Sequence, residues 1–181
     1  GLVNAISPNG VSVSVDARGK GGKVWDNLLE ALLHHALTPT QHLRKVFETS
    51  PTFDSTVQGL SSGDMIDEMY FIVGGTKAGE GTILSRGRNK LDDAWPLNSS
   101  EPTGWYRLQT NYDHWQPVPK ADDRRHPGYA HMDAMGQDNL SLPGILKVLE
   151  TWPTFNSHTD YTALMAAWNG TYESMAWMQN E

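Results

Sequence analysis

The chain contains no cysteine among its 181 residues. It therefore has no disulfide framework, no thiolate metal site and no cysteine nucleophile of its own. Basic residues are also few, because 14 Lys and Arg stand against 21 Asp and Glu, which gives a net charge of -7. Nucleic acid repels a chain of that charge, and the basic clusters at 86–88 and 124–125 are too small to reverse this. We expect no nucleic-acid partner.

Long apolar runs are absent as well. No run approaches the length of a membrane-spanning helix, so we expect no transmembrane segment. The first residues, GLVN, lack the charged region and apolar stretch of a signal peptide, and we expect none within this sequence. Three Asn-x-Ser/Thr sequons, at Asn98, Asn139 and Asn169, are candidate glycosylation sites for passage through the secretory pathway.

The length and the hydrophobic fraction of 38% suffice for one domain with a real core. The alternation of valine with serine over residues 11–15 predicts a half-buried strand. An apolar stripe over residues 25–36 predicts an amphipathic helix. A second helix is expected after Thr38, with Pro39 in its first turn and Gln41 closing a capping box. Ser50-Pro51 gives a similar start signal for a third.

The second half of the chain is richer in strand signals. The runs 69–75 and 81–86 predict a buried hairpin, whose turn is the glycine-rich segment 74–81. Another strand is expected over 105–110, and Ser141 is expected to cap a helix. Asn169-Gly170 between the aromatic-rich runs 161–168 and 172–177 predicts a further hairpin. The order of elements indicates an α+β sandwich of sheets and helices.

The segment TNYDHWQPVPKADDRR, residues 110–125, concentrates polar chemistry. Asn111 stands at the end of the predicted strand, where an amide could donate a hydrogen bond to an oxyanion without titrating. The alternative is an asparagine that bonds its own turn. Arg124 and Arg125 follow two aspartates, and the simplest interpretation of such a run is a solvated cluster of ion pairs.

The histidines give weaker signals. His114, beside Asp113, is a candidate base, but no Gly-x-Ser-x-Gly nucleophile motif accompanies it. His126 and His131 are five residues apart, a spacing that does not bring both to one helical face. We therefore expect no metal site.

Several motifs occur in the order typical of one enzyme family: YFIVGGTKAGEGTILSRGRN, WPLN, QTNYDHWQPVPKADDRR, GQDNLSL and HTDYTALM. On these motifs the chain, from about Trp25 onward, resembles the acid ceramidase and N-acylethanolamine acid amidase family of N-terminal-nucleophile amidases. The Trp-Pro-Leu and Lys-x-Asp-Asp-Arg-Arg details resemble the acylethanolamine amidase branch more closely. The resemblance implies an αββα sandwich of the N-terminal-nucleophile hydrolase type, here missing its first strands. Residues 1–181 would then be a single domain, the C-terminal larger part of the catalytic domain.

The resemblance also implies a mechanism. Family members cleave their own precursor to expose an N-terminal cysteine, whose α-amine serves as the base. The oxyanion donor corresponds to Asn111 and a residue that orders the cleft corresponds to Arg124, with Tyr112, Asp113 and His114 in supporting positions. Substrates are fatty-acid amides, N-acylethanolamines or ceramide-like, which are split into fatty acid and amine in acidic lysosomes. No cofactor is implied.

Two departures from the family pattern leave two alternatives open. The family's cysteine, and the arginine and aspartate soon after it, lie upstream of Gly1, and Ala17 stands where relatives carry glutamate. In one alternative, the nucleophile resides on an N-terminal cysteine-bearing segment or chain of the same precursor. In the other, the protein is a non-catalytic relative that binds lipid or protein. The seven tryptophans are compatible with peripheral lipid contact, although core packing explains most of them.

Overall fold

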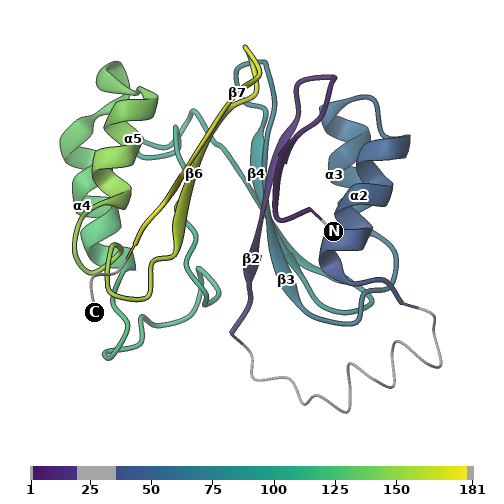
Figure 1. Ribbon diagram of the computed structural model, residues 1–181, viewed down its shortest axis with the longest axis horizontal. Coiled ribbons are helices and arrows are strands. Elements are labelled where there is room, and N and C mark those ends of the chain that lie inside the picture. Colours follow the sequence, from purple (N-terminus) through teal and green to yellow (C-terminus); the bar gives the residue numbers. More distant parts are fainter. Residues whose placement is uncertain (1, 20–35, 179–181) are drawn as a thin grey trace.

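The computed structural model describes residues 2–19 and 36–178. Its elements lie in layers in the order helix, sheet, sheet, helix (Figure 1), which confirms the predicted αββα arrangement. The first layer holds helices α2 (Pro39–Thr49) and α3 (Phe53–Ser61). The helix predicted over 25–36 falls, except for its last residue, outside the described residues.

A five-stranded antiparallel sheet forms the second layer. Its order follows the chain: β1 (Asn4–Ile6), β2 (Ser12–Ala17), β3 (Met69–Gly74), β4 (Gly81–Arg86) and β5 (Leu91–Pro96). The predicted hairpin of β3 and β4 is confirmed, and its turn is closed by a 2.9 Å hydrogen bond from the Gly75 amide to the Glu80 carbonyl. The pairing of β2 with β3 joins the first two strands of the chain to the β3–β4 hairpin in one sheet.

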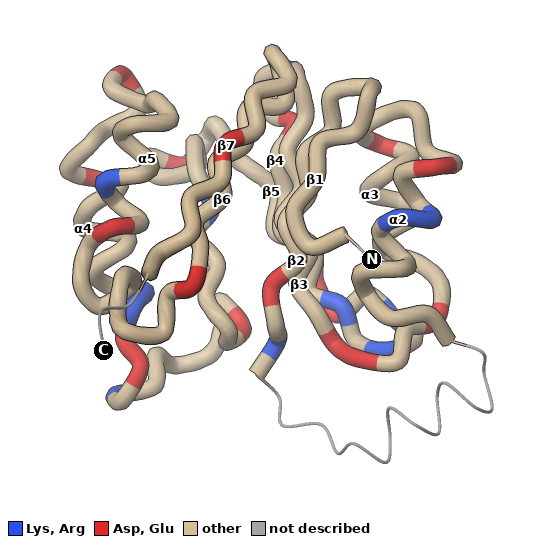
Figure 2. The backbone as a smooth tube through the Cα atoms, in the orientation of Figure 1, with Lys and Arg blue, Asp and Glu red and all other residues tan. Residues whose placement is uncertain are grey.

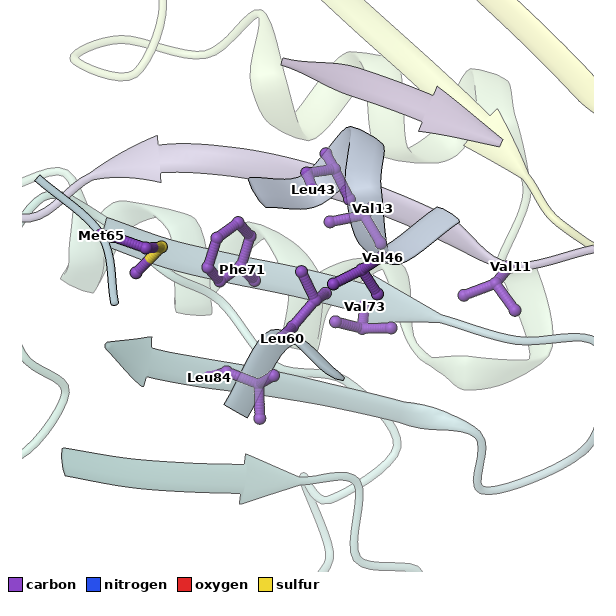
Figure 3. Packing of buried hydrophobic residues seen from close by; sticks show 9 residues of the cluster. All are labelled: Val11, Val13, Leu43, Val46, Leu60, Met65, Phe71, Val73 and Leu84. Atoms are coloured by element: carbon purple, nitrogen blue, oxygen red, sulfur yellow. The ribbon is translucent and has the colours of Figure 1, made fainter. Parts of the chain in front are cut away.

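The main core lies between this sheet and the first helical layer. Side chains from β2, β3 and β4 meet those of α2 and α3 in Figure 3. Both helices begin with the side-chain geometry that satisfies free backbone amides: Thr38 and Gln41 form the predicted capping box, and Thr52, rather than Ser50, caps α3. The buried residues of this core are Val11, Val13, Leu43, Val46, Leu60, Met65, Phe71, Val73 and Leu84.

The opposite face of the sheet is more polar. Because side chains alternate along a strand, Val13 and Val15 pack with the helices, whereas Ser14 and Asp16 face the other way. That face looks toward the second sheet, the hairpin of β6 (Tyr161–Ala166) and β7 (Thr171–Ala176) (Figure 1). This hairpin confirms the prediction made from Asn169-Gly170.

Helices α4 (Arg125–Met135) and α5 (Leu142–Leu149) form the last layer, separated by a short 3-10 turn, η1 (Gln137–Asn139). Ser141 caps α5 as predicted, by accepting from the Gly144 amide at 3.2 Å. A second small core joins these helices to the segment before them. Its members are Tyr106, Met132 and Val148, with Trp105, Leu108, Tyr129 and Met135 against them.

The strand predicted over 105–110 is wrong, because these residues are irregular. Their apolar side chains pack on α4 and α5, and so the segment crosses between layers instead of pairing. Strand β5 and helix α4 are not among the predicted elements, because their sequences have weak strand and helix signals. Strand β5 includes two aspartates and a proline, and it lies at the edge of the sheet beside β4. Helix α4 has no side-chain cap and contains Pro127 and Gly128.

Among residues 2–19 and 36–178, no helix combines the length and apolar character needed to cross a membrane. In the view of Figure 2, Lys and Arg positions lie among Asp and Glu positions on both sides of the molecule.

Candidate active site

Asn111 lies in a loop held against the end of β2, and not at the end of a strand as predicted. The amide of Gly19 donates to the Asn111 carbonyl at 2.7 Å. A side chain at Gly19 would place its Cβ 2.8 Å from that carbonyl oxygen, closer than real Cβ contacts come. The contact therefore depends on a residue without a side chain.

The side-chain amide of Asn111 is fully engaged. Its Nδ2 donates to Oδ1 of Asp16 and to the carbonyl of Ala17, each at 2.9 Å. Its Oδ1 accepts from Nη2 of Arg124 at 2.7 Å. Because an amide nitrogen has two hydrogens, both donors of Asn111 are in use in this arrangement. The amide does not simply bond its own turn, since its partners come from β2 and from the residue before α4.

Arg124 is held in turn by Asp122. Its Nε donates to Oδ1 at 2.7 Å and its Nη2 to Oδ2 at 2.8 Å, a bidentate arrangement. These hydrogen bonds to Asp122 raise the pKa of Arg124 above its ordinary value, so the cation is permanent. The predicted ion pair is present, but it supports the Asn111 amide instead of being only a solvated surface feature.

Asp16 lies on the polar face of β2, opposite Tyr70 of β3 in the sheet register. Burial raises the pKa of this carboxyl above its ordinary value. The Ala17 amide, the positive charge of Arg124 and the Asn111 amide act in the opposite direction without overcoming burial.

Asp113, a predicted supporting residue, is buried and anchors the loop that carries Asn111 to the five-stranded sheet. One of its oxygens, Oδ1, accepts from Nε of Arg18 at 2.6 Å and from the Tyr70 hydroxyl at 2.7 Å. Burial, together with the adjacent Asp113, raises the pKa of Tyr70, which keeps the phenol protonated as a donor. Arg18 also pairs with Asp92 on β5. The group ties the loop to β3, to β5 and to the residue that follows Ala17 at the end of β2.

The sequence interpretation that places Arg125 in a solvated cluster of ion pairs is wrong, because only 6% of the residue is exposed. Its guanidinium lies 4.4 Å from the centroid of the Tyr112 ring. The two terminal nitrogens donate to backbone carbonyls at 2.8 to 3.2 Å. Those carbonyls belong to Tyr112, Asp113, His114 and Gln116.

Two hollows meet at this group. A small one of about 200 Å³ is lined by Asn111 together with Gly19, Tyr70, Tyr112, Asp113 and Gln116. A larger cleft of about 500 Å³ lies between the polar face of the first sheet and β6. Asp16 and Arg124, the partners of Asn111, line this cleft with Ser14, His158, Asp160 and Thr162 among others. Asn111 thus lines the small hollow, and two of its hydrogen-bond partners line the larger cleft.

Comparison with known proteins gives this geometry a context. The N-acylethanolamine-hydrolyzing acid amidase of Cavia porcellus is 41% identical over 167 residues, which cover 92% of this chain and 47% of that protein. The acid ceramidase of Pan troglodytes is 30% identical over 96% of this chain and 44% of that protein. The chain belongs to the acid ceramidase and N-acylethanolamine acid amidase family. The higher identity favours the acylethanolamine amidase branch.

A solved structure of the family agrees with the fold. The Caenorhabditis elegans N-acylethanolamine-hydrolyzing acid amidase ortholog superposes with a TM-score of 0.79 at 28% identity, covering 93% of this chain and 70% of that one. The α+β fold of the N-terminal-nucleophile hydrolase type is thereby confirmed. The chain spans about half the length of the curated relatives it matches. No family model matches the chain.

Two other predicted site residues, His114 and Tyr112, form hydrogen bonds to groups other than the Asn111 side chain. His114 stacks on Trp95 at a centroid distance of 4.0 Å, and its Nε2 lies 3.1 Å from Oδ2 of Asp93. It therefore belongs to the β5 side of the loop. The hydroxyl of Tyr112 donates to the Asp122 carbonyl at 3.3 Å and so braces the Arg124 segment.

Sequence reasoning within the family pattern missed Asp16, Arg18, Tyr70 and Arg125 as members of the site. Tyr70 lies inside one predicted strand and Asp16 directly follows another, and only the pairing of β2 with β3 brings the two residues together. Among the described residues, no group of three or more His, Asp or Glu side chains is arranged to hold a metal ion.

Proposed function

We propose that the protein containing this chain hydrolyses fatty-acid amides, such as N-acylethanolamines or ceramide-like lipids, to a fatty acid and an amine. The cysteine nucleophile comes from an N-terminal segment or chain of the same precursor. The observation that carries the proposal is the 2.7 Å hydrogen bond from Arg124 to Oδ1 of Asn111. It fixes which end of the amide is the acceptor, and so identifies Nδ2 as the donor end that an oxyanion would require.

The proposed chemistry divides one difficult step into two. The α-amine of the cysteine takes the proton of the thiol while the sulfur forms a bond to the amide carbonyl carbon. The carbonyl oxygen becomes an oxyanion, to which Asn111 donates. The C–N bond then breaks, the leaving amine takes the proton, and water releases the fatty acid from the thioester. Arg124 keeps the amide oriented throughout.

The two-stranded sheet of β6 and β7 supports the need for a further segment. A two-stranded antiparallel hairpin is at best marginally stable alone. Among the described residues, β6 and β7 pair with each other and with no further strand. The cleft beside β6 is open to an additional element. We assign the partner to the cysteine-bearing part of the precursor, with autoproteolytic processing as in the family pattern. A lysosomal or secretory location fits the names of the relatives, which describe an acid amidase and an acid ceramidase.

The test uses the full-length protein and a fluorogenic fatty amide at acidic pH. We expect hydrolysis, and a fall in kcat of about 100-fold to 1,000-fold on Asn111→Ala, the usual loss for one oxyanion donor. Gln137→Ala, an exposed amide in η1, is the matched control and should leave kcat unchanged. The proposal fails if the full-length protein has no upstream cysteine, or if it is inactive across the acidic range.

A non-catalytic relative is the second candidate function, favoured by the engagement of both Asn111 donors and by Ala17. In this alternative the cleft binds an intact lipid or protein. Hydrolysis that disappears on Asn111→Ala disposes of it.

A further inference from the structure

Asp16 occupies the position at which the Asn111 amide would have to act. Its Oδ1 accepts from Asn111 Nδ2 at 2.9 Å, while the other Asn111 hydrogen is held by the Ala17 carbonyl. An oxyanion seeking the same nitrogen must therefore displace one of these acceptors. Of the two, a carboxylate is the stronger competitor, because hydrogen bonds to ionised acceptors are roughly twice as strong as neutral ones.

Charge makes the competition more severe. An ionised Asp16 would lie next to the negative charge that develops on the carbonyl oxygen, and like charges in a partly buried site oppose each other strongly. A neutral carboxyl removes the repulsion and weakens the hold on Nδ2. The ionisation of Asp16 thus decides whether the Asn111 donor is free.

Charged and titratable groups surround Asp16 from several elements. Arg124, before α4, is the nearby cation, and its charge is shared with Asp122. Tyr70 is the cross-strand neighbour on β3. His158, Asp160 and Tyr161 line the same cleft from the segment leading into β6 and from β6 itself.

We propose that Asp16 is a positioning residue that withholds the Asn111 amide while ionised and releases it to the oxyanion when protonated. This inference rests on the proposed amide hydrolysis and deepens it, since it gives this chain a structural reason to work in acid. Nothing in the Asn111–Arg124 bond needs to change during the release, because that bond uses the amide oxygen.

The electrostatics of the site agree in direction. Burial raises the pKa of Asp16 above the ordinary value of 3.8, so the neutral form persists to higher pH in the folded protein than in the unfolded chain. As pH rises through that raised pKa the carboxylate forms, and activity should fall.

The first test compares pH profiles of kcat/KM for the full-length protein and Asp16→Asn, which keeps the shape and removes the titration. Above the pKa of Asp16, we expect the ratio of variant to wild-type activity to rise about tenfold per pH unit until another group limits the rate. Asp54→Asn, an exposed acid in the first turn of α3, should reproduce the wild-type profile. An Asp16→Asn profile that parallels the wild type overturns the proposal.

The second test does not depend on turnover. In full-length protein with ¹⁵N-labelled asparagine, the Asn111 side-chain signals, assigned by their loss in Asn111→Asp, should shift as Asp16 titrates in acid and should stay constant in Asp16→Asn. Signals that do not respond to pH in the wild type overturn the proposal, even if the variant fails to fold. Wild-type protein inactive at every pH refutes the proposed hydrolysis instead, while this measurement still decides the link between Asp16 and Asn111.

Discussion

The hydroxyl of Tyr70 donates a 2.7 Å hydrogen bond to the carboxylate of Asp113, and this contact joins the middle of the five-stranded sheet to the loop that carries Asn111. Both residues are buried. The bond therefore transmits the rigidity of β3 to a segment that has no regular secondary structure of its own.

Removing the charge of Asp113 should destabilise the fold more than removing the Tyr70 hydroxyl. Asp113→Asn leaves the buried Arg18 with one carboxylate fewer, and we expect a loss of about 3 kcal/mol. Tyr70→Phe deletes one hydrogen bond, at a cost of about 1 kcal/mol. Urea unfolding measures both, with Tyr172→Phe, on the exposed hairpin, as the control. Equal losses for the two buried variants would contradict this hierarchy.

Arg125→Lys tests the arginine that binds the loop carbonyls. A lysine has a single nitrogen and cannot reach carbonyls that the planar guanidinium spans, so we expect a loss of about 2 kcal/mol in unfolding free energy. Arg44→Lys, an exposed arginine paired with Glu48, should change stability by less than about 0.5 kcal/mol. Similar behaviour of the two variants would show that the carbonyl contacts are dispensable.

Gly19→Ala should displace the Asn111 loop. The added Cβ would meet the Asn111 carbonyl at 2.8 Å, and overpacking of this kind costs about 1–3 kcal/mol. Because the same carbonyl accepts from Gly19, we also expect a loss of kcat in the full-length protein. Gly87→Ala is the matched control, since its nearest neighbours lie at an ordinary 3.5 Å. Unchanged kcat and stability in Gly19→Ala would refute the close approach.

His42 should make the fold less stable as pH falls. Burial, and the positive charge of Arg86, lower its pKa below 6.5, so the native state binds fewer protons than the unfolded chain. Unfolding free energy should then decline as pH drops through 6.5, by up to about 1.4 kcal/mol per pH unit. Denaturation of wild type, His42→Gln and the exposed control His131→Gln across this range measures the effect. The decline attributable to His42 should be missing only in His42→Gln.

Of the sequons at Asn98 and Asn169, the one at Asn169 is better placed for a glycan. It is exposed between β6 and β7, whereas Asn98 is half-buried and donates to Glu101 at 2.8 Å. In a secretory host, Asn169→Gln should remove one glycan mass that glycosidase digestion also removes, and Asn98→Gln should leave the mass pattern unchanged. A glycan on Asn98 and none on Asn169 would contradict this ranking.

The sequence correctly predicted the helices and hairpins whose signals lie within one short segment. The capping box at Thr38, the β3–β4 hairpin and the turn at Asn169-Gly170 each combine periodicity with a start or turn residue, and all are present. The family motif placed Asn111 and Arg124 together, and they are hydrogen bonded.

The features that could not be predicted from the sequence depend on contacts between segments that are distant in the chain. The apolar residues at 105–108 looked like a strand because alternation cannot tell pairing from packing on helices. Asp16 directly follows the alternating segment 11–15 in the sequence, and only the sheet register and the position of the loop show that it lies beside Asn111.

The bonds from Arg18 to Asp113 and from Asn111 to Asp16 each join residues separated by 95 positions. Closing so long a loop costs entropy that only an established sheet and helical layer can offset. We therefore expect these contacts to form late in folding, after β2 and β3 have paired and packed against their covering helices. Substitutions at the site should hasten unfolding and leave the folding rate nearly untouched, so the lifetime of the native state is set where the chemistry is proposed to occur.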